Sequence, residues 1–325
     1  MKYIDMHCDT LMKLASKDAS PELYSNSFSV DFKRMAIGEA KAQFFAVFML
    51  PQGSPRLAAL DNISDDDYID LLHKILFDNL DKYSPHAAFA SNIDMLKAND
   101  AAGKATAFLT IEDGRAVQGD MAKLEKYYGM GFRLISLTWN NENCFGSPNS
   151  YDPEVMNRGL SDFGKEAVVR MNELGMLIDV SHLSDGGFWD VVKLTKKPFV
   201  ASHSNCRAIS AHKRNLTDDM IKAIGQNGGA IGINFGPEFL NEDLTRVEST
   251  VQLMSRHISR MKDIGGIDCI ALGSDFDGIH GELQVSASDK MGLIFDRLHW
   301  DGFTDDEIEK IAHKNIERVI ADSMR

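Results

Sequence analysis

Eight short apolar runs, rich in β-branched and aromatic residues, recur along the chain, and stretches with helical periodicity separate most of them. The runs cover residues 2–7, 42–50, 105–112, 132–139, 176–182, 198–203, 229–235 and 269–274. Nearly continuous apolar strands are typical of a parallel sheet that is covered on both faces. Eight such strands alternating with helices predict an α/β fold, a (β/α)8 TIM-type barrel, with residues 1–325 forming a single domain. An open doubly wound sheet is the competing arrangement, but no glycine-rich nucleotide-binding loop follows an early strand.

Helical periodicity and capping residues support this alternation. The periodic segments are 65–80, 121–128, 161–174, 184–194, 218–226, 250–264, 290–298 and 305–320. Ser161, Thr217 and Thr304 stand where N-cap residues are expected, and Gly175 stands at an expected C-cap. Two long polar segments, 140–162 and 236–250, predict loops at the C-terminal face, where barrel enzymes carry their active sites.

Composition excludes several classes of protein. The net charge of −13 argues against partners such as nucleic acid or an anionic membrane surface, and it requires a local cation wherever an anionic substrate binds. The chain begins with no basic, apolar leader and contains no apolar stretch of about 18 residues. The four cysteines are far apart and form no paired motif, as expected of reduced thiols. We therefore expect a cytoplasmic protein.

Ionisable side chains stand at the ends of five of the predicted strands. They are His7, Asp9, Glu112, His182, His203 and Asp275. Taken singly, each is readily explained as a hydrogen-bonded or solvent-facing residue at a strand end. In a barrel, however, the carboxyl ends of the strands converge on one opening, so three imidazoles and three carboxylates would meet there. Their joint placement favours a metal site.

The chemistry of this set suits divalent metals. Imidazole and carboxylate ligands bind zinc and other first-row metals. Six candidates exceed the three protein ligands of one catalytic zinc, and two metals that share a bridging carboxylate would use them better. Water bound to such metals ionises near neutral pH, so the nucleophile needs no serine or cysteine. A remaining carboxylate can then move the proton.

Motifs along nearly the whole chain carry a family resemblance. They are "DMHCDT", "FLTIEDG", "LTWNNEN", "RGLSDFGKEAVVRMNELGMLIDVSHLSD", "SHSNCRAISAHKRNLTDD" and "GSDFDG". In this order and combination the chain resembles the membrane (renal) dipeptidase family of binuclear zinc peptidases, as a cytoplasmic bacterial-type member. The resemblance implies a (β/α)8 barrel that hydrolyses dipeptides, including some with a C-terminal D-residue, by means of a metal-bridging hydroxide.

The resemblance also implies roles for single residues. With two Zn²⁺ per chain, the first metal would be bound by His7 and Asp9 and the second by His182 and His203, and Glu112 would bridge them. Asp275 would transfer the proton. Arg214 would bind the terminal carboxylate of the dipeptide, a role that suits a bidentate guanidinium. From the residues alone, a surface ion pair of Arg214 with Asp218 or Asp219 is the favoured interpretation.

One position departs from the family pattern. Better-known members end the fourth strand in Leu-Thr-His, and that histidine is thought to bond the substrate carbonyl or the tetrahedral intermediate. Here Trp139 stands there, with a single N–H donor, and Asn140 and Asn143 are nearby donors that could replace the histidine. Two alternatives therefore stay open. One is a related metal hydrolase that acts on another amide or a lactone, and the other is a metal-binding protein with impaired catalysis. A homodimer is a reasonable expectation, because the family forms dimers, but no sequence feature marks an interface.

Overall fold

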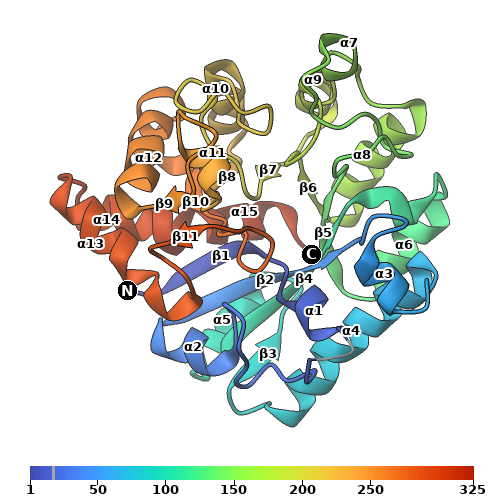
Figure 1. Ribbon diagram of the computed structural model, residues 1–325, viewed down its shortest axis with the longest axis horizontal. Helices are drawn as coiled ribbons and strands as arrows, with labels where there is room; N and C mark the ends of the chain where they lie inside the picture. The colour runs from blue at the N-terminus through green and yellow to red at the C-terminus, as the bar shows by residue number, and fades with distance from the viewer. Residues whose placement is uncertain (17–18) are drawn as a thin grey trace.

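Eight parallel strands close into a barrel in the computed structural model, which describes residues 1–16 and 19–325 (Figure 1). The strands are β1 (Tyr3–Cys8), β2 (Ala40–Phe48), β4 (Ala105–Glu112), β5 (Phe132–Ser136), β6 (Leu177–Asp179), β7 (Val200–Ala201), β8 (Ala230–Ile233) and β10 (Ile270–Leu272). The barrel is closed because β1 pairs with both β2 and β10, and β2 pairs with β4. The predicted (β/α)8 fold is confirmed, and each predicted run overlaps one barrel strand.

Three short strands were not predicted. β3 (Ala87–Phe89) pairs with the first half of β4, whose second half pairs with β5. β9 (Glu248–Ser249) and β11 (Glu282–Leu283) pair with each other in the loops above the barrel. Strands this short escape prediction because two or three residues are too few to show an alternation of apolar and polar side chains.

The helices lie mostly outside the barrel (Figure 1). The α-helices are α1 (Thr10–Leu14), α2 (Phe32–Ile37), α3 (Pro55–Ala59), α4 (Asp65–Lys82), α5 (Ile93–Ala101), α6 (Met121–Gly129), α7 (Pro153–Met156), α8 (Asp162–Leu174), α9 (Asp185–Leu194), α10 (Asp218–Asn227), α11 (Pro237–Leu240), α12 (Val251–Gly265), α13 (Gly292–Trp300), α14 (Asp305–Glu309) and α15 (Asn315–Ser323). In the part of the chain described, none is long and apolar enough to cross a membrane.

The predicted caps are confirmed. The side chains of Ser161, Thr217 and Thr304 accept hydrogen bonds from the first turns of α8, α10 and α14, and Gly175 ends α8 with a φ of 83°. The last predicted helix is not continuous, because a π-helical turn, Lys310–Lys314, separates α14 from α15.

Helix α15 closes one end of the barrel. Its buried residues Ile316, Val319 and Ile320 join an apolar cluster with residues from the starts of the strands, among them Ile4 and Ala42. A larger apolar cluster packs the helices against the outside of the barrel. Since the N-terminal opening is sealed by this packing, the C-terminal end is left for a site.

Candidate metal centre and active site

The six ionisable side chains predicted from the strand ends meet at the C-terminal opening of the barrel. His7 lies in β1 and Asp9 follows it, Glu112 ends β4, and the other three lie within three residues of the ends of β6, β7 and β10, namely His182, His203 and Asp275. Each is at most 9% exposed. Side chains from five strands, distant in sequence, therefore form one buried cluster.

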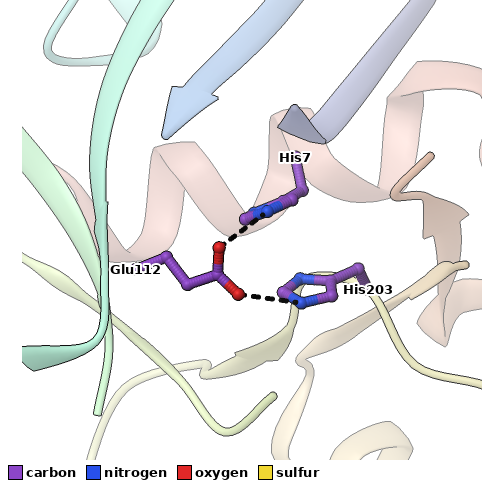
Figure 2. Close-up of side chains that lie close together, drawn as sticks. All are labelled: His7, Glu112 and His203. Carbon is purple, nitrogen blue, oxygen red and sulfur yellow. Dashed lines mark ion pairs between the residues drawn. The ribbon is translucent and has the colours of Figure 1, made fainter. Parts of the chain in front are cut away.

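Glu112 lies between the imidazoles of His7 and His203 (Figure 2). Its Oε2 is 3.3 Å from Nε2 of His7, and its Oε1 is 3.0 Å from Nε2 of His182 and 3.6 Å from Nε2 of His203. Each oxygen of one carboxylate therefore faces different imidazole nitrogens. This is the arrangement that a carboxylate bridging two metal ions requires.

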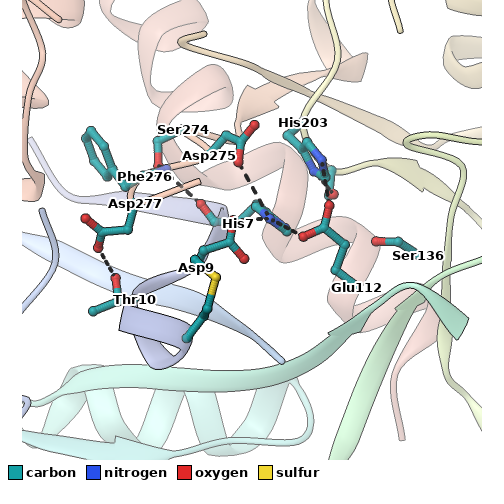
Figure 3. Close-up of polar contacts among 12 residues, drawn as sticks. His7, Asp9, Thr10, Glu112, Ser136, His203, Ser274, Asp275, Phe276 and Asp277 are labelled. Carbon is teal, nitrogen blue, oxygen red and sulfur yellow. Dashed lines mark hydrogen bonds and ion pairs between the residues drawn. The ribbon is translucent and has the colours of Figure 1, made fainter. Parts of the chain in front are cut away.

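Asp9 and Asp275 approach His7 from the other side (Figure 3). Nε2 of His7 lies 3.8 Å from Oδ2 of Asp9 and 3.9 Å from Oδ1 of Asp275. Nε2 of His7 and Oδ1 of Asp9 are buried and have no hydrogen-bond partner among the described residues. Buried polar atoms without partners are costly, and their convergence fits a metal ligand set. Ligand atoms of His7, Glu112 and His203, and of His7, Asp9 and Asp275, each lie within 4.8 Å of one another.

Burial and mutual repulsion shape the electrostatics of the cluster. Burial raises the pKa of Glu112 to about 7 and that of Asp275 to about 8. Burial also lowers the pKa of His203 well below its ordinary value, while for His7 the nearby Glu112 and Asp9 outweigh burial and raise the pKa. Carboxylates crowded out of water repel one another, and divalent cations would offset that repulsion.

A cleft of about 640 Å³ opens above the cluster. Trp139 and Asn140, the two residues predicted to contact substrate that precede Asn143, line this cleft. The Trp139 ring packs edge-on against Phe48 at 5.0 Å. The structure does not bring Asn143 to the cleft, because its Nδ2 donates instead to Oδ1 of Asp113 and to the carbonyl oxygen of Leu137. These two hydrogen bonds connect Asn143 to Asp113 and to the segment that follows β5.

Arg214 presents a buried guanidinium to the same cleft. Nη2 donates to the carbonyl oxygen of His203 at 3.1 Å, and Nη1 donates to Oγ of Ser204 at 3.3 Å. Nε has no partner among the described residues, and none of their carboxylates lies within ion-pair distance of the guanidinium. The interpretation of Arg214 as a surface ion pair is wrong, because the side chain is only 6% exposed and Asp218 pairs with Arg260. A buried cation without a directly bonded carboxylate is suited to an anionic ligand.

Comparison with known proteins agrees with this geometry. Residues 1–324 match the family described as membrane dipeptidase, peptidase family M19. The chain belongs to this family. A protein of the pqqA 5′ region of Klebsiella pneumoniae is 37% identical over 65% of this chain and 79% of its own length. An uncharacterised dipeptidase of Schizosaccharomyces pombe is 29% identical over 95% of this chain and 74% of its own.

A solved structure shares the whole fold. A metallopeptidase from Rhodobacter sphaeroides, whose structure holds a phosphinate mimic of the dipeptide L-Ala-D-Ala, superposes with a TM-score of 0.88. The match is 24% identical and covers 99% of each chain. Membership of a dipeptidase family and the clustered histidines and carboxylates together make the chain a metallopeptidase family member with residues able to bind metal.

Sequence reasoning missed the groups that orient the predicted ligands of this dipeptidase fold. Asp179 is fully buried and accepts hydrogen bonds from the hydroxyls of Ser136 and Ser202. Asp5 is equally buried and accepts from the backbone N–H and the hydroxyl of Ser274. The available signal was an aspartate in the middle of an apolar strand, in "YIDMH" and "LIDVSH", since such a carboxylate needs buried partners.

The backbone conformation of two site residues could not be predicted from the sequence either. His182 and Asp275 have φ values of 68° and 62°, in the left-handed region that non-glycine residues rarely adopt. Each such residue costs on the order of 1–3 kcal/mol, and such strain is concentrated at functional sites. In this dipeptidase fold both strained residues belong to the buried cluster at the barrel opening.

Proposed function

We propose that this chain is a zinc-dependent dipeptidase that binds two Zn²⁺ ions. His7 and Asp9 would hold one ion, His182 and His203 would hold the other, and Glu112 would contribute to both sites. The observation that carries the proposal is the position of the Glu112 carboxylate. One of its oxygens lies 3.3 Å from Nε2 of His7, and the other lies 3.0 Å from Nε2 of His182. Neutral imidazole and carboxylate are good zinc ligands, and burial keeps the pKa of His182 and His203 low enough for both to stay unprotonated.

Asp275 is the residue that moves the proton. The zinc ions supply Lewis acidity and make water ionise near neutral pH. Asp275 accepts the proton of the attacking water and delivers it to the leaving nitrogen. Its Oδ2 accepts a hydrogen bond from Nδ2 of Asn234 at 2.9 Å, which leaves Oδ1 directed toward His7 and the metal ligands. A carboxylate whose pKa is raised toward neutrality by burial suits transfer in both directions.

Arg214 selects substrates with a free terminal carboxylate. Its buried guanidinium has no ion-pair partner among the described residues, and its unpartnered Nε is available to donate to an anion. A dipeptide presents its scissile carbonyl and its terminal carboxylate only one residue apart, so both reach their partners in one cleft. The phosphinate mimic of L-Ala-D-Ala in the Rhodobacter sphaeroides structure supports a C-terminal D-residue among the substrates.

The test is hydrolysis of a panel of L,L- and L,D-dipeptides by protein with measured metal content. Turnover that requires about two zinc ions per chain, and that is lost when the C-terminal carboxylate is amidated, is the expected result. The panel includes acyl amides and lactones as comparison substrates. Turnover of these alone would overturn the dipeptidase assignment, and two bound metals without any turnover would indicate a site disabled at Trp139.

A further inference from the structure

The opening of the cleft carries more positive charge than the proposed dipeptidase reaction uses. Apart from the metal and proton-transfer residues, its charged lining consists of three cations, Arg56, Lys213 and Arg214, and one carboxylate, Glu238. His212 also lines the cleft, but burial lowers its pKa to about 4, so it is neutral at pH 7. In a chain with a net charge of −13, this local excess of cations indicates that the cleft binds an anionic ligand. Arg214 is assigned to the terminal carboxylate, and two cations remain.

Arg56 is the less engaged of these two. Its Nη1 donates to Sδ of Met12 at 2.7 Å, which is a weak acceptor, and no described carboxylate lies within ion-pair distance of its guanidinium. The side chain is exposed at the mouth of the cleft. By contrast, the ammonium of Lys213 lies over the ring of Tyr151, 5.4 Å from its centroid. Arg56 is therefore free to bind an anion in the cleft.

Topology places Arg56 and Arg214 on opposite sides of the opening. Arg56 lies on α3 in the connection after β2, and Arg214 lies in the connection after β7. Around the closed barrel the order is β1, β2, β4, β5, β6, β7, β8 and β10, so β2 and β7 are four strands apart on either route. The metal ligands lie between them. A dipeptide with its terminal carboxylate at Arg214 therefore extends its N-terminal residue toward Arg56.

We infer that Arg56 forms the subsite for the side chain of the N-terminal residue and selects an acidic residue, Glu or Asp, there. This inference rests on the dipeptidase function proposed above. Arg56 in this place repels the α-ammonium of a neutral N-terminal residue, and a side-chain carboxylate on the same residue offsets that repulsion. The guanidinium binds such a carboxylate in a bidentate manner, which an amide of the same shape does not reproduce.

The experiment compares isosteric pairs, Glu-Ala with Gln-Ala and Ala-Glu with Ala-Gln, by kcat/KM on zinc-loaded protein. Arg56 is partly in water, so we expect a preference of about fivefold to tenfold for Glu-Ala over Gln-Ala, decreasing in 0.5 M salt. Arg56→Gln should abolish this preference, because kcat/KM for Glu-Ala falls relative to kcat/KM for Gln-Ala. The same preference should appear as a Kd difference when the two peptides bind to a catalytically inactive Asp275→Asn protein.

Two variants act as controls. Arg256→Gln removes an exposed arginine on α12 that does not line the cleft, and it should preserve the preference. Lys213→Gln distinguishes a direct contact with Arg56 from a general electrostatic attraction by all the cations of the cleft. A general attraction would be weakened by either substitution, whereas a direct contact would be lost only in the Arg56 variant. Equal loss in the Arg56 and Lys213 variants would overturn the inference. Turnover of dipeptides without any preference for Glu-Ala would also overturn it and leave the proposed dipeptidase function standing, whereas absence of turnover on every dipeptide would remove both.

Discussion

Oγ of Ser202 lies 2.7 Å from Nδ1 of His203 and also donates its only proton to Oδ2 of Asp179. Since that proton goes to the carboxylate, Ser202 must accept from Nδ1–H of His203. The tautomer of His203 is thereby set, and the lone pair of Nε2 is directed toward Glu112, 3.6 Å away. A second hydrogen-bonding partner of this kind orients a metal-binding histidine and makes it a better ligand.

Ser202→Ala should weaken metal binding by about tenfold to a hundredfold, because His203 loses both its orientation and its tautomer. The measurement is competition with a chromophoric chelator. The matched control is Ser323→Ala, which removes a buried hydroxyl that donates to the carbonyl oxygen of Pro198, on β7's N-terminal side. Equal metal affinity in both variants would contradict an orienting role for Ser202.

Asp275→Asn should lower kcat by roughly 10²–10⁴ without lowering the metal content, because the amide keeps the hydrogen bond to Asn234 but cannot accept a proton. Kinetics and metal analysis on the same preparation check this. Full activity in the metal-loaded variant would exclude Asp275 as the proton carrier. Loss of metal together with activity would instead indicate that Asp275 is a ligand.

Trp139→His should raise kcat on dipeptides by at least about tenfold, because a well-placed donor to the developing oxyanion contributes roughly 10²–10³ in rate. Trp139 lies 6.1 Å from His182, ring centroid to ring centroid, so a histidine there is placed near the cluster of histidines and carboxylates. Trp139→Phe is the companion variant, because it keeps the ring and removes the indole N–H. If Phe and His variants both match the wild type, neither side chain contacts the reacting carbonyl.

His257 should make the protein less stable as the pH falls. Its buried ring accepts from the backbone N–H of Cys206 and donates to the carbonyl oxygen of Leu240, and burial lowers its pKa to about 4. The unfolded chain, with an ordinary pKa near 6.5, therefore binds a proton that the folded chain does not. The contribution is complete above pH 6.5 and is lost as the pH falls toward 4.

Urea unfolding at pH 7.5 and pH 5 measures this effect. Between these values wild type should lose about 2 kcal/mol more free energy of unfolding than His257→Gln, which carries no titrating group at this position. Equal losses in the two proteins would show that His257 does not titrate on unfolding.

Some features of this protein follow from local sequence. Apolar runs that end in His7, Glu112 or Asp275 predicted the strands and the polar residues at their ends, because a buried strand must be apolar and the end of a strand need not be. Caps such as Ser161 and Thr304 were predictable because a hydroxyl accepting from the N3 backbone N–H is a contact within four residues.

Tertiary structure decided which of these residues meet and how. The carboxylate of Glu112 divides between His7 and His182 only because β1, β4 and β6 are brought together around a closed barrel. The burial of Arg214 without a counter-charge, and the turn of Asn143 away from the cleft, depend on contacts made by distant segments. Sequence determines the period and chemistry of each segment, whereas burial, tautomer and charge balance are properties of the assembled environment, which no single segment contains.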